Sequence, residues 1–172
     1  MKKYFASLAV AAAFVATPAM ANDFAGVRTE VTAGLDDVTN AVDATDVTYG
    51  AAIGYDLQFG KVVLGVEATA ANVFDRADLG GAARLGYTLN KNVLAFGRVG
   101  YNDLERPQTC TPGIGNRPAV CRDASNLDGV TVGGGIEAIL AGPFFTKVEY
   151  RYTDFAGTAA RHGAVVGVGV RF

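Results

Sequence analysis

One histidine and one serine are the residues of this sequence whose types could carry out hydrolysis. His162 is the only histidine of the chain, and Ser125 is the only serine after residue 21. A serine nucleophile needs a base within hydrogen-bond reach and a third group that orients the base. These two residues fall on different predicted loops, and no orienting group accompanies them. We therefore expect no catalytic residues and a solvated histidine at a rim of the fold, with a lipid-modifying enzyme as the alternative.

Two further patterns could bind a metal or a phosphate, and both lack the required spacing. Asp36, Asp37, Asp43 and Asp46 make one predicted loop acidic without the spacing of a calcium loop. The glycines at 133–135 lie within a predicted strand, whereas a phosphate-binding loop joins a strand to a helix. We expect the aspartates of the acidic loop to be solvated. We also expect the protein to bind no metal and no cofactor.

The first 21 residues have the order of a secretory signal peptide. Lys2 and Lys3 precede a short apolar run at 8–16, and Ala19-Met20-Ala21 provides a small-x-small cleavage site. The expected division is therefore a signal peptide at 1–21 and a single domain at 22–172. That domain carries 13 basic and 17 acidic residues without a basic cluster, which argues against binding to nucleic acid.

The two cysteines, Cys110 and Cys121, are close in sequence in a chain that we expect to be exported. Oxidising compartments favour disulfides, and this spacing and ligand number do not suit a Cys-x2-Cys metal site. We predict a disulfide that stabilises the fold by about 3 kcal/mol.

Apolar and polar residues alternate with the period of two that is typical of β-strands. In the last segment, for example, Val166, Val168 and Val170 share one face and glycines the other. The fifth segment alternates least cleanly and places Phe96 on the inward face. Eight segments show the pattern: 27–35, 47–57, 62–70, 82–89, 93–101, 129–140, 144–153 and 162–172.

The connections between these segments alternate in length, which predicts the architecture. Short turns are expected at 58–61, 90–92 and 141–143, and longer loops at 36–46, 71–81, 102–128 and 154–161. A strand of roughly 9–11 residues crosses a bilayer, and only a closed sheet leaves no unpaired edge in lipid. The sequence therefore predicts an all-β protein, an eight-stranded antiparallel up-and-down transmembrane β-barrel.

Four stretches carry a resemblance to the outer-membrane β-barrel family of small OmpA-like barrels and opacity-type surface antigens. They are A-R-L-G-Y at 83–87, G-V-T-V-G-G-G-I-E at 129–137, F-F-T-K-V-E-Y-R-Y-T-D-F at 144–155 and the terminal G-V-R-F. The resemblance implies the outer membrane of a Gram-negative bacterium, with outer-membrane lipid, lipopolysaccharide, periplasmic chaperones and the barrel-assembly machinery as partners. It also implies an assembly signal in Val168, Val170 and Phe172. We expect no periplasmic peptidoglycan-binding domain, and we keep open divalent ions that bridge the acidic loop to lipopolysaccharide.

Charged residues occupy the inward positions of most segments. Buried charges are costly unless paired, and an eight-stranded barrel has room for little more than side chains. We therefore expect a salt-bridge network that plugs the lumen, with Glu137 near Lys147 and Glu67 near Arg84. Besides Asp56, the set comprises Arg28, Glu30, Glu67, Arg84, Arg98, Glu137, Lys147, Glu149, Arg151 and Arg171.

The expected function is that of a non-enzymatic outer-membrane protein with a structural or surface-antigen role. The loop from Asn102 to Asp128 contains three prolines and both cysteines, and is the best candidate for an extracellular ligand site. A small low-conductance channel is the main alternative. A soluble periplasmic barrel with its apolar face inward is a further one.

Overall fold

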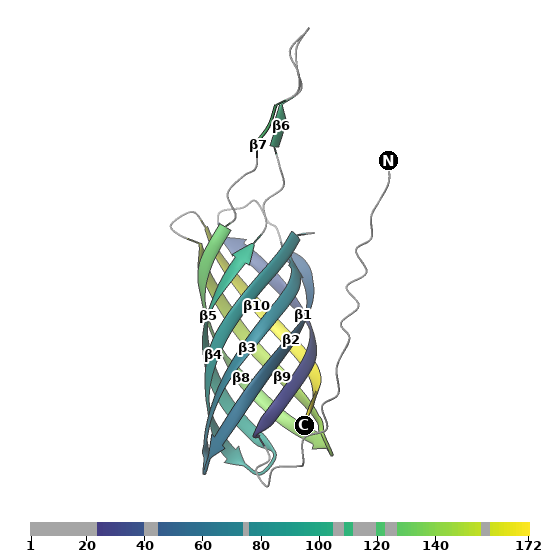
Figure 1. The fold of residues 1–172 in the computed structure, drawn as a ribbon, viewed down its shortest axis with the longest axis vertical. Helices are drawn as coiled ribbons and strands as arrows, with labels where there is room; N and C mark the ends of the chain where they lie inside the picture. The colour runs from purple at the N-terminus through teal and green to yellow at the C-terminus, as the bar shows by residue number, and fades with distance from the viewer. Residues whose placement is uncertain are drawn as a thin grey trace.

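The computed structural model describes residues 24–39, 45–73, 76–104, 109–111, 120–122, 127–155 and 159–172. In these residues the chain forms a closed antiparallel barrel of eight strands (Figure 1), as predicted. The barrel strands are β1 (Gly26–Thr39), β2 (Thr45–Phe59), β3 (Val62–Val73), β4 (Arg76–Asn90), β5 (Val93–Leu104), β8 (Leu127–Ala141), β9 (Phe144–Phe155) and β10 (Ala159–Arg171).

Each barrel strand pairs with the next one along the chain, and β10 returns to pair with β1. The backbones of Val27 and Phe172 exchange two hydrogen bonds at this seam, with N···O distances of 3.1 and 2.8 Å. Two short strands, β6 (Thr109–Thr111) and β7 (Val120–Arg122), form a separate hairpin between β5 and β8. Figure 1 shows this hairpin beyond the end of the barrel that lies opposite the carboxy-terminus.

The strands are longer than the apolar alternation predicts, and the expected loop boundaries were wrong. Pairing between β3 and β4 continues through Ala71–Asp78 to Val73–Arg76, all within the segment expected to be a loop at 71–81. Backbone hydrogen bonds do not depend on side-chain polarity, so a hairpin continues past the apolar belt into polar sequence. Glycines with positive φ make two of the tight turns at the other end, Gly60 at 62° and Gly142 at 54°.

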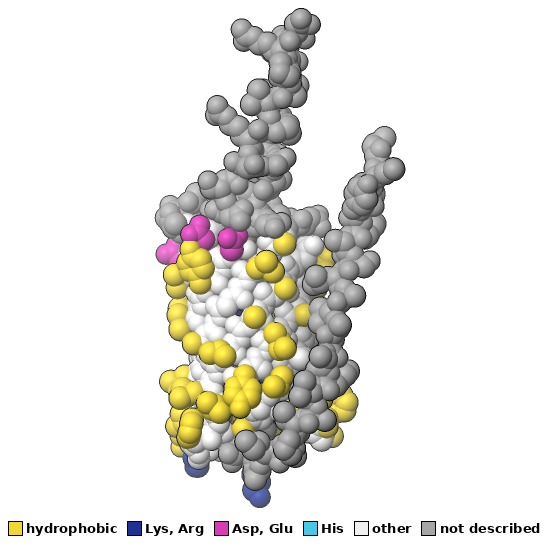
Figure 2. Space-filling model, viewed as in Figure 1, with side chains coloured by type: hydrophobic (Ala, Val, Ile, Leu, Met, Phe, Trp, Pro, Cys, Tyr) yellow, Lys and Arg dark blue, Asp and Glu magenta, His cyan; other side chains and the backbone are white. Residues whose placement is uncertain are grey.

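The apolar faces of the strands point outward and the charged faces point inward. Val166 and Val168 are 54% and 55% exposed, whereas Arg28 and Glu137 are fully buried. Figure 2 shows apolar side chains over the barrel wall, with acidic groups at one rim and basic groups at the other. This orientation rules out the soluble barrel with an apolar interior. Phe96 is buried, as expected for an inward residue. The described residues contain no helix long and apolar enough to span a membrane.

A small apolar cluster closes the interior at the end with the tight turns. Phe24, Val63 and Leu94 are fully buried there, and Ile139 packs against them. Gln58 holds the entering chain in place, because its Oε1 accepts a hydrogen bond from the Phe24 amide at 3.0 Å. The charged interior begins directly above this cluster, where Arg171 lies over the ring of Phe24 at 5.9 Å.

Glycine makes room for the long charged side chains inside the barrel. A Cβ atom added at Gly65 would lie 1.9 Å from Oδ1 of Asp56, and one at Gly163 would lie 2.1 Å from Oδ1 of Asp36. These glycines leave the space that the neighbouring carboxylates occupy.

We predict that Gly65→Ala destabilises the barrel by about 1–3 kcal/mol, because the added methyl group forces a buried carboxylate to move. The matched control is Gly97→Ala, whose Cβ would meet only a backbone oxygen at 3.8 Å on the exposed face. Urea unfolding in detergent, followed by far-UV circular dichroism, measures both. Equal unfolding midpoints for the two variants would contradict the steric argument.

Candidate functional site

The lumen is filled by ionised side chains from all eight strands. All ten predicted lumen residues and Asp56 point into it, and each takes part in at least one ion pair. They are brought together because inward positions alternate along every strand and an eight-stranded barrel is narrow. The side chains are almost fully buried, and Arg151, at 17% side-chain exposure, is the most open of the set.

Asp56 is at the centre of the lower part of this network. Its Oδ2 accepts hydrogen bonds from Arg28 Nε at 3.1 Å and from Arg171 Nη1 at 2.8 Å, and its Oδ1 lies 3.5 Å from Arg84 Nε. Arg28 also pairs with Glu67 and with Glu30. One carboxylate therefore neutralises guanidinium groups from three strands.

Most ion pairs reach across the lumen and skip at least one strand. Glu137 on β8 binds Arg84 on β4 at 2.9 Å and Arg171 on β10 at 2.6 Å. Arg98 on β5 binds Glu67 on β3 at 2.9 Å and Glu149 on β9 at 3.1 Å. Lys147 on β9 joins Glu149 at 3.0 Å and Glu30 on β1 at 2.5 Å.

The register confirms that Glu137 lies opposite Lys147, but neither of the two ion pairs expected from sequence forms. Glu137 is directly opposite Lys147 on the neighbouring strand, yet its carboxylate binds Arg84 and Arg171. Glu67 binds Arg28 and Arg98 instead of Arg84. Long side chains in a barrel converge on the axis, so the partner is set by proximity at the axis instead of by strand register.

A second polar layer lies nearer the rim with the longer connections. Arg161 on β10 reaches directly across the barrel to Asp78 on β4 at 2.8 Å, and its Nε lies 3.8 Å from Asp36 on β1. The layer continues through Asn102, which donates to Asp78 at 2.7 Å and accepts from Thr131 at 2.9 Å.

Sequence reasoning missed this outer layer and placed Asp36 in a solvated loop, which was wrong. Asp36 is 6% exposed and faces Arg161 inside the barrel. The sequence contained a signal for this layer. Each of its polar residues is two positions from an inward-facing glycine, on the side of that glycine nearer the rim. These residues are Asp36, Asp78, Asn102 and Arg161. The apolar half of the alternation ends before these positions, whereas the strands continue.

The outer layer balances the charge of the lumen. Among the inward side chains that the structure describes, seven basic groups face seven acidic ones once Arg161, Asp36 and Asp78 are added. Aromatic rings complete the packing, since Arg84 lies 4.7 Å from the ring centre of Phe96 and Arg171 lies 5.6 Å from that of Phe145. Paired burial of this kind avoids the high cost of isolated charges in a low dielectric.

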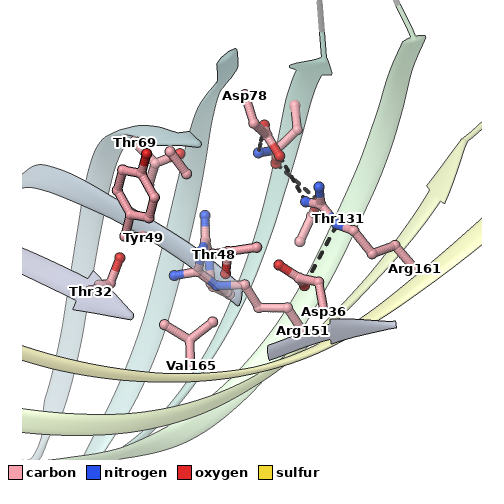
Figure 3. A pocket seen from close by; sticks show the side chains of 13 residues that line it. Thr32, Asp36, Thr48, Tyr49, Thr69, Asp78, Thr131, Arg151, Arg161 and Val165 are labelled. Atoms are coloured by element: carbon pink, nitrogen blue, oxygen red, sulfur yellow. Dashed lines mark hydrogen bonds and ion pairs between the residues drawn. The ribbon is translucent and has the colours of Figure 1, made fainter. Parts of the chain in front are cut away.

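A cavity of about 20 Å³ separates the central network from the outer layer. Figure 3 shows Arg161 joined by dashed lines to Asp78 and to Asp36, with Arg151 among the other side chains that line the cavity. This volume suits a single water-sized occupant.

His162 lies on the outward face of β10 and not in the lumen. Its Nδ1 is 2.5 Å from the hydroxyl of Tyr150, and its ring meets that of Tyr152 at 5.0 Å between centroids. The histidine is thus half-buried between tyrosines instead of fully solvated. Ser125, the nucleophile of the alternative hypothesis, lies outside the described residues.

The predicted disulfide agrees with the backbone of the β6–β7 hairpin, where Cys110 is paired with Cys121. Directly paired residues of antiparallel strands have Cα atoms about 4.5–5.5 Å apart, a separation that a disulfide can span. The disulfide stays a prediction, since the side chains of both cysteines are outside the described part of the structure. The signal peptide at 1–21, Asp43 and most of the loop between Asn102 and Asp128 are also outside it.

Comparison with known proteins agrees with this architecture. Residues 6–172 match the family described as outer membrane protein beta-barrel domain. A 22 kDa outer membrane protein of Rhizobium leguminosarum bv. viciae is 34% identical over 137 residues, which are 69% of this chain. The match spans 63% of that relative, so the chain covers less than two thirds of its length.

Solved structures of two small surface barrels share the fold at low sequence identity. Ail, the attachment invasion locus protein of Yersinia pestis, superimposes with a TM-score of 0.55 at 14% identity, over 86% of this chain and 99% of Ail. Neisserial surface protein A gives a TM-score of 0.52 at 12% identity, over 85% of this chain and 96% of that protein. With the match over residues 6–172, the closed barrel and its outward apolar faces, the chain belongs to the outer membrane protein beta-barrel domain family and resides in the outer membrane.

Proposed function

We propose that this protein is a closed, non-conducting and non-enzymatic barrel that has a structural or surface-antigen role. The observation that carries the proposal is the ionic network, which cross-links all eight strands through the lumen. An apolar cluster closes one end and the Arg161–Asp78 bridge crosses the other. The cavity between the layers measures about 20 Å³, which is room for about one water molecule.

The part of the chain that would meet partners outside the cell is the connection between β5 and β8. The β6–β7 hairpin extends it beyond the rim (Figure 1), and a Cys110–Cys121 disulfide would fix its shape. A preorganised loop loses less conformational entropy on binding than a free one. In this proposal the barrel is the anchor, and any extracellular ligand binds at this loop.

The remaining expected partners follow from the location of the protein. Outer-membrane lipid and lipopolysaccharide surround the apolar wall, and we infer that periplasmic chaperones and the barrel-assembly machinery deliver the chain. Val168 is exposed on the outer face of β10, where such an assembly signal would be read. We assign no catalytic role to His162, which lies on the outward face of β10 in contact with the rings of Tyr150 and Tyr152.

We predict no discrete conductance steps when the purified protein is reconstituted into planar bilayers, because paired charges fill the lumen. A general porin in the same bilayers is the positive control. Stable unitary currents would overturn the closed barrel in favour of the channel.

We also predict that an epitope inserted after Gly115 is accessible to antibody on intact cells. An epitope that antibody cannot reach would overturn the surface role of the loop.

We predict that Glu137→Gln lowers the free energy of unfolding by roughly 3 kcal/mol, because Arg84 and Arg171 each lose one of two charged partners in a buried site and keep only Asp56. Asp154→Asn, at an exposed position of β9, is the matched control and should stay within about 0.5 kcal/mol of the parent. The chain contains no tryptophan, so circular dichroism and the heat-dependent gel shift are the suitable readouts. An unchanged unfolding midpoint for Glu137→Gln would show that the network does not stabilise the barrel.

A further inference from the structure

The cavity in the outer half of the lumen is lined by more cationic than anionic groups. Arg98, Arg151 and Arg161 border it, against the carboxylates of Asp36 and Asp78. Both carboxylates are directed at Arg161, which binds Asp78 through Nη2 at 2.8 Å and lies 3.8 Å from Asp36 through Nε. Threonine hydroxyls contribute much of the remaining surface.

Two of the guanidinium groups that border the cavity each contain one N–H donor without a hydrogen-bond acceptor. Within the described residues, Nε of Arg98 and Nη1 of Arg161 are buried without a hydrogen-bond partner, and each of these arginines is 6% exposed. A buried charged donor without an acceptor carries a desolvation cost that an accepting group in the cavity would offset. Among the described residues that line the cavity, no buried acceptor atom lacks a hydrogen-bond partner.

We propose that this cavity binds one monatomic anion of the chloride class, held by Arg98 and Arg161. The unsatisfied groups are donors only, so the fitting occupant is one that only accepts hydrogen bonds. A water molecule also fits the volume and could donate to the aspartate and threonine oxygens of the lining, so the experiment below must separate the two occupants. The cavity of about 20 Å³ has room for about one water-sized occupant, which favours a monatomic anion over the larger phosphate, sulfate and carboxylate groups.

The charge balance of the lumen sets the strength of this site. Seven basic and seven acidic inward groups already cancel, so the anion adds one uncompensated charge. Binding is therefore weak and reversible, and it follows the chloride concentration outside the cell. The site is independent of the proposed surface role, and a closed barrel remains closed whether or not the anion binds.

Crystals of the full chain grown in bromide test the proposal directly. We expect an anomalous difference peak within hydrogen-bond distance of Arg98 Nε and Arg161 Nη1. Density at this place without anomalous signal would identify a water and overturn the assignment, as would the absence of any peak.

A measurement in solution uses two alanines of β3. Ligand binding to the folded state alone stabilises it in proportion to the logarithm of ligand concentration, so the urea midpoint should rise with chloride relative to gluconate at equal ionic strength. Ala71→Val fills the cavity and should abolish this rise, whereas Ala68→Val, on the outward face, should keep it. A midpoint equal in both salts, or a rise that survives Ala71→Val, would overturn the site. If Ala71→Val does not fold, the bromide crystal decides alone.

Discussion

Closing the barrel brings Arg28 of the first strand directly opposite Arg171 of the last strand, and Asp56 makes that arrangement tolerable. Like charges facing each other on paired strands are destabilising. Asp56 accepts hydrogen bonds from both guanidinium groups with one oxygen atom, and Arg171 finds a second carboxylate in Glu137. The seam between β1 and β10 is thus held by backbone hydrogen bonds and by the carboxylate of Asp56, which belongs to a third strand, β2. The same requirement, that every buried charge has a partner, governs the rest of the lumen.

The interior is layered as a result. An apolar cluster lies at the tight turns, a dense ionic network occupies the middle, and a looser layer of aspartate, asparagine and threonine lies near the other rim. The inward glycines make room for the charged side chains, since Gly65 and Gly163 leave the space that two aspartates fill. The cavity described above lies between the two polar layers, where three arginines and two aspartates border it.

Much of this structure could be predicted from the sequence because the period of two is a property of the extended backbone. It identified the eight strands, the outward valines and the inward charges, including the position of Phe96. The partners of Glu137 and Glu67 could not be predicted, because they depend on how side chains meet at the axis. The outer layer was missed for another reason: hydropathy marks the membrane belt, whereas Asp36 and Arg161 belong to strands that continue beyond it.

The ion pairs that skip strands have a consequence for how the chain enters the bilayer. A single hairpin such as β4–β5 places Arg84 directly opposite Arg98, and the carboxylate partners of both are on other strands, so alone in hydrocarbon it would present unpaired charge to lipid chains. Stepwise insertion of hairpins is therefore energetically unfavourable for this sequence. The network therefore favours enclosure of the polar faces among several strands before the wall crosses the membrane.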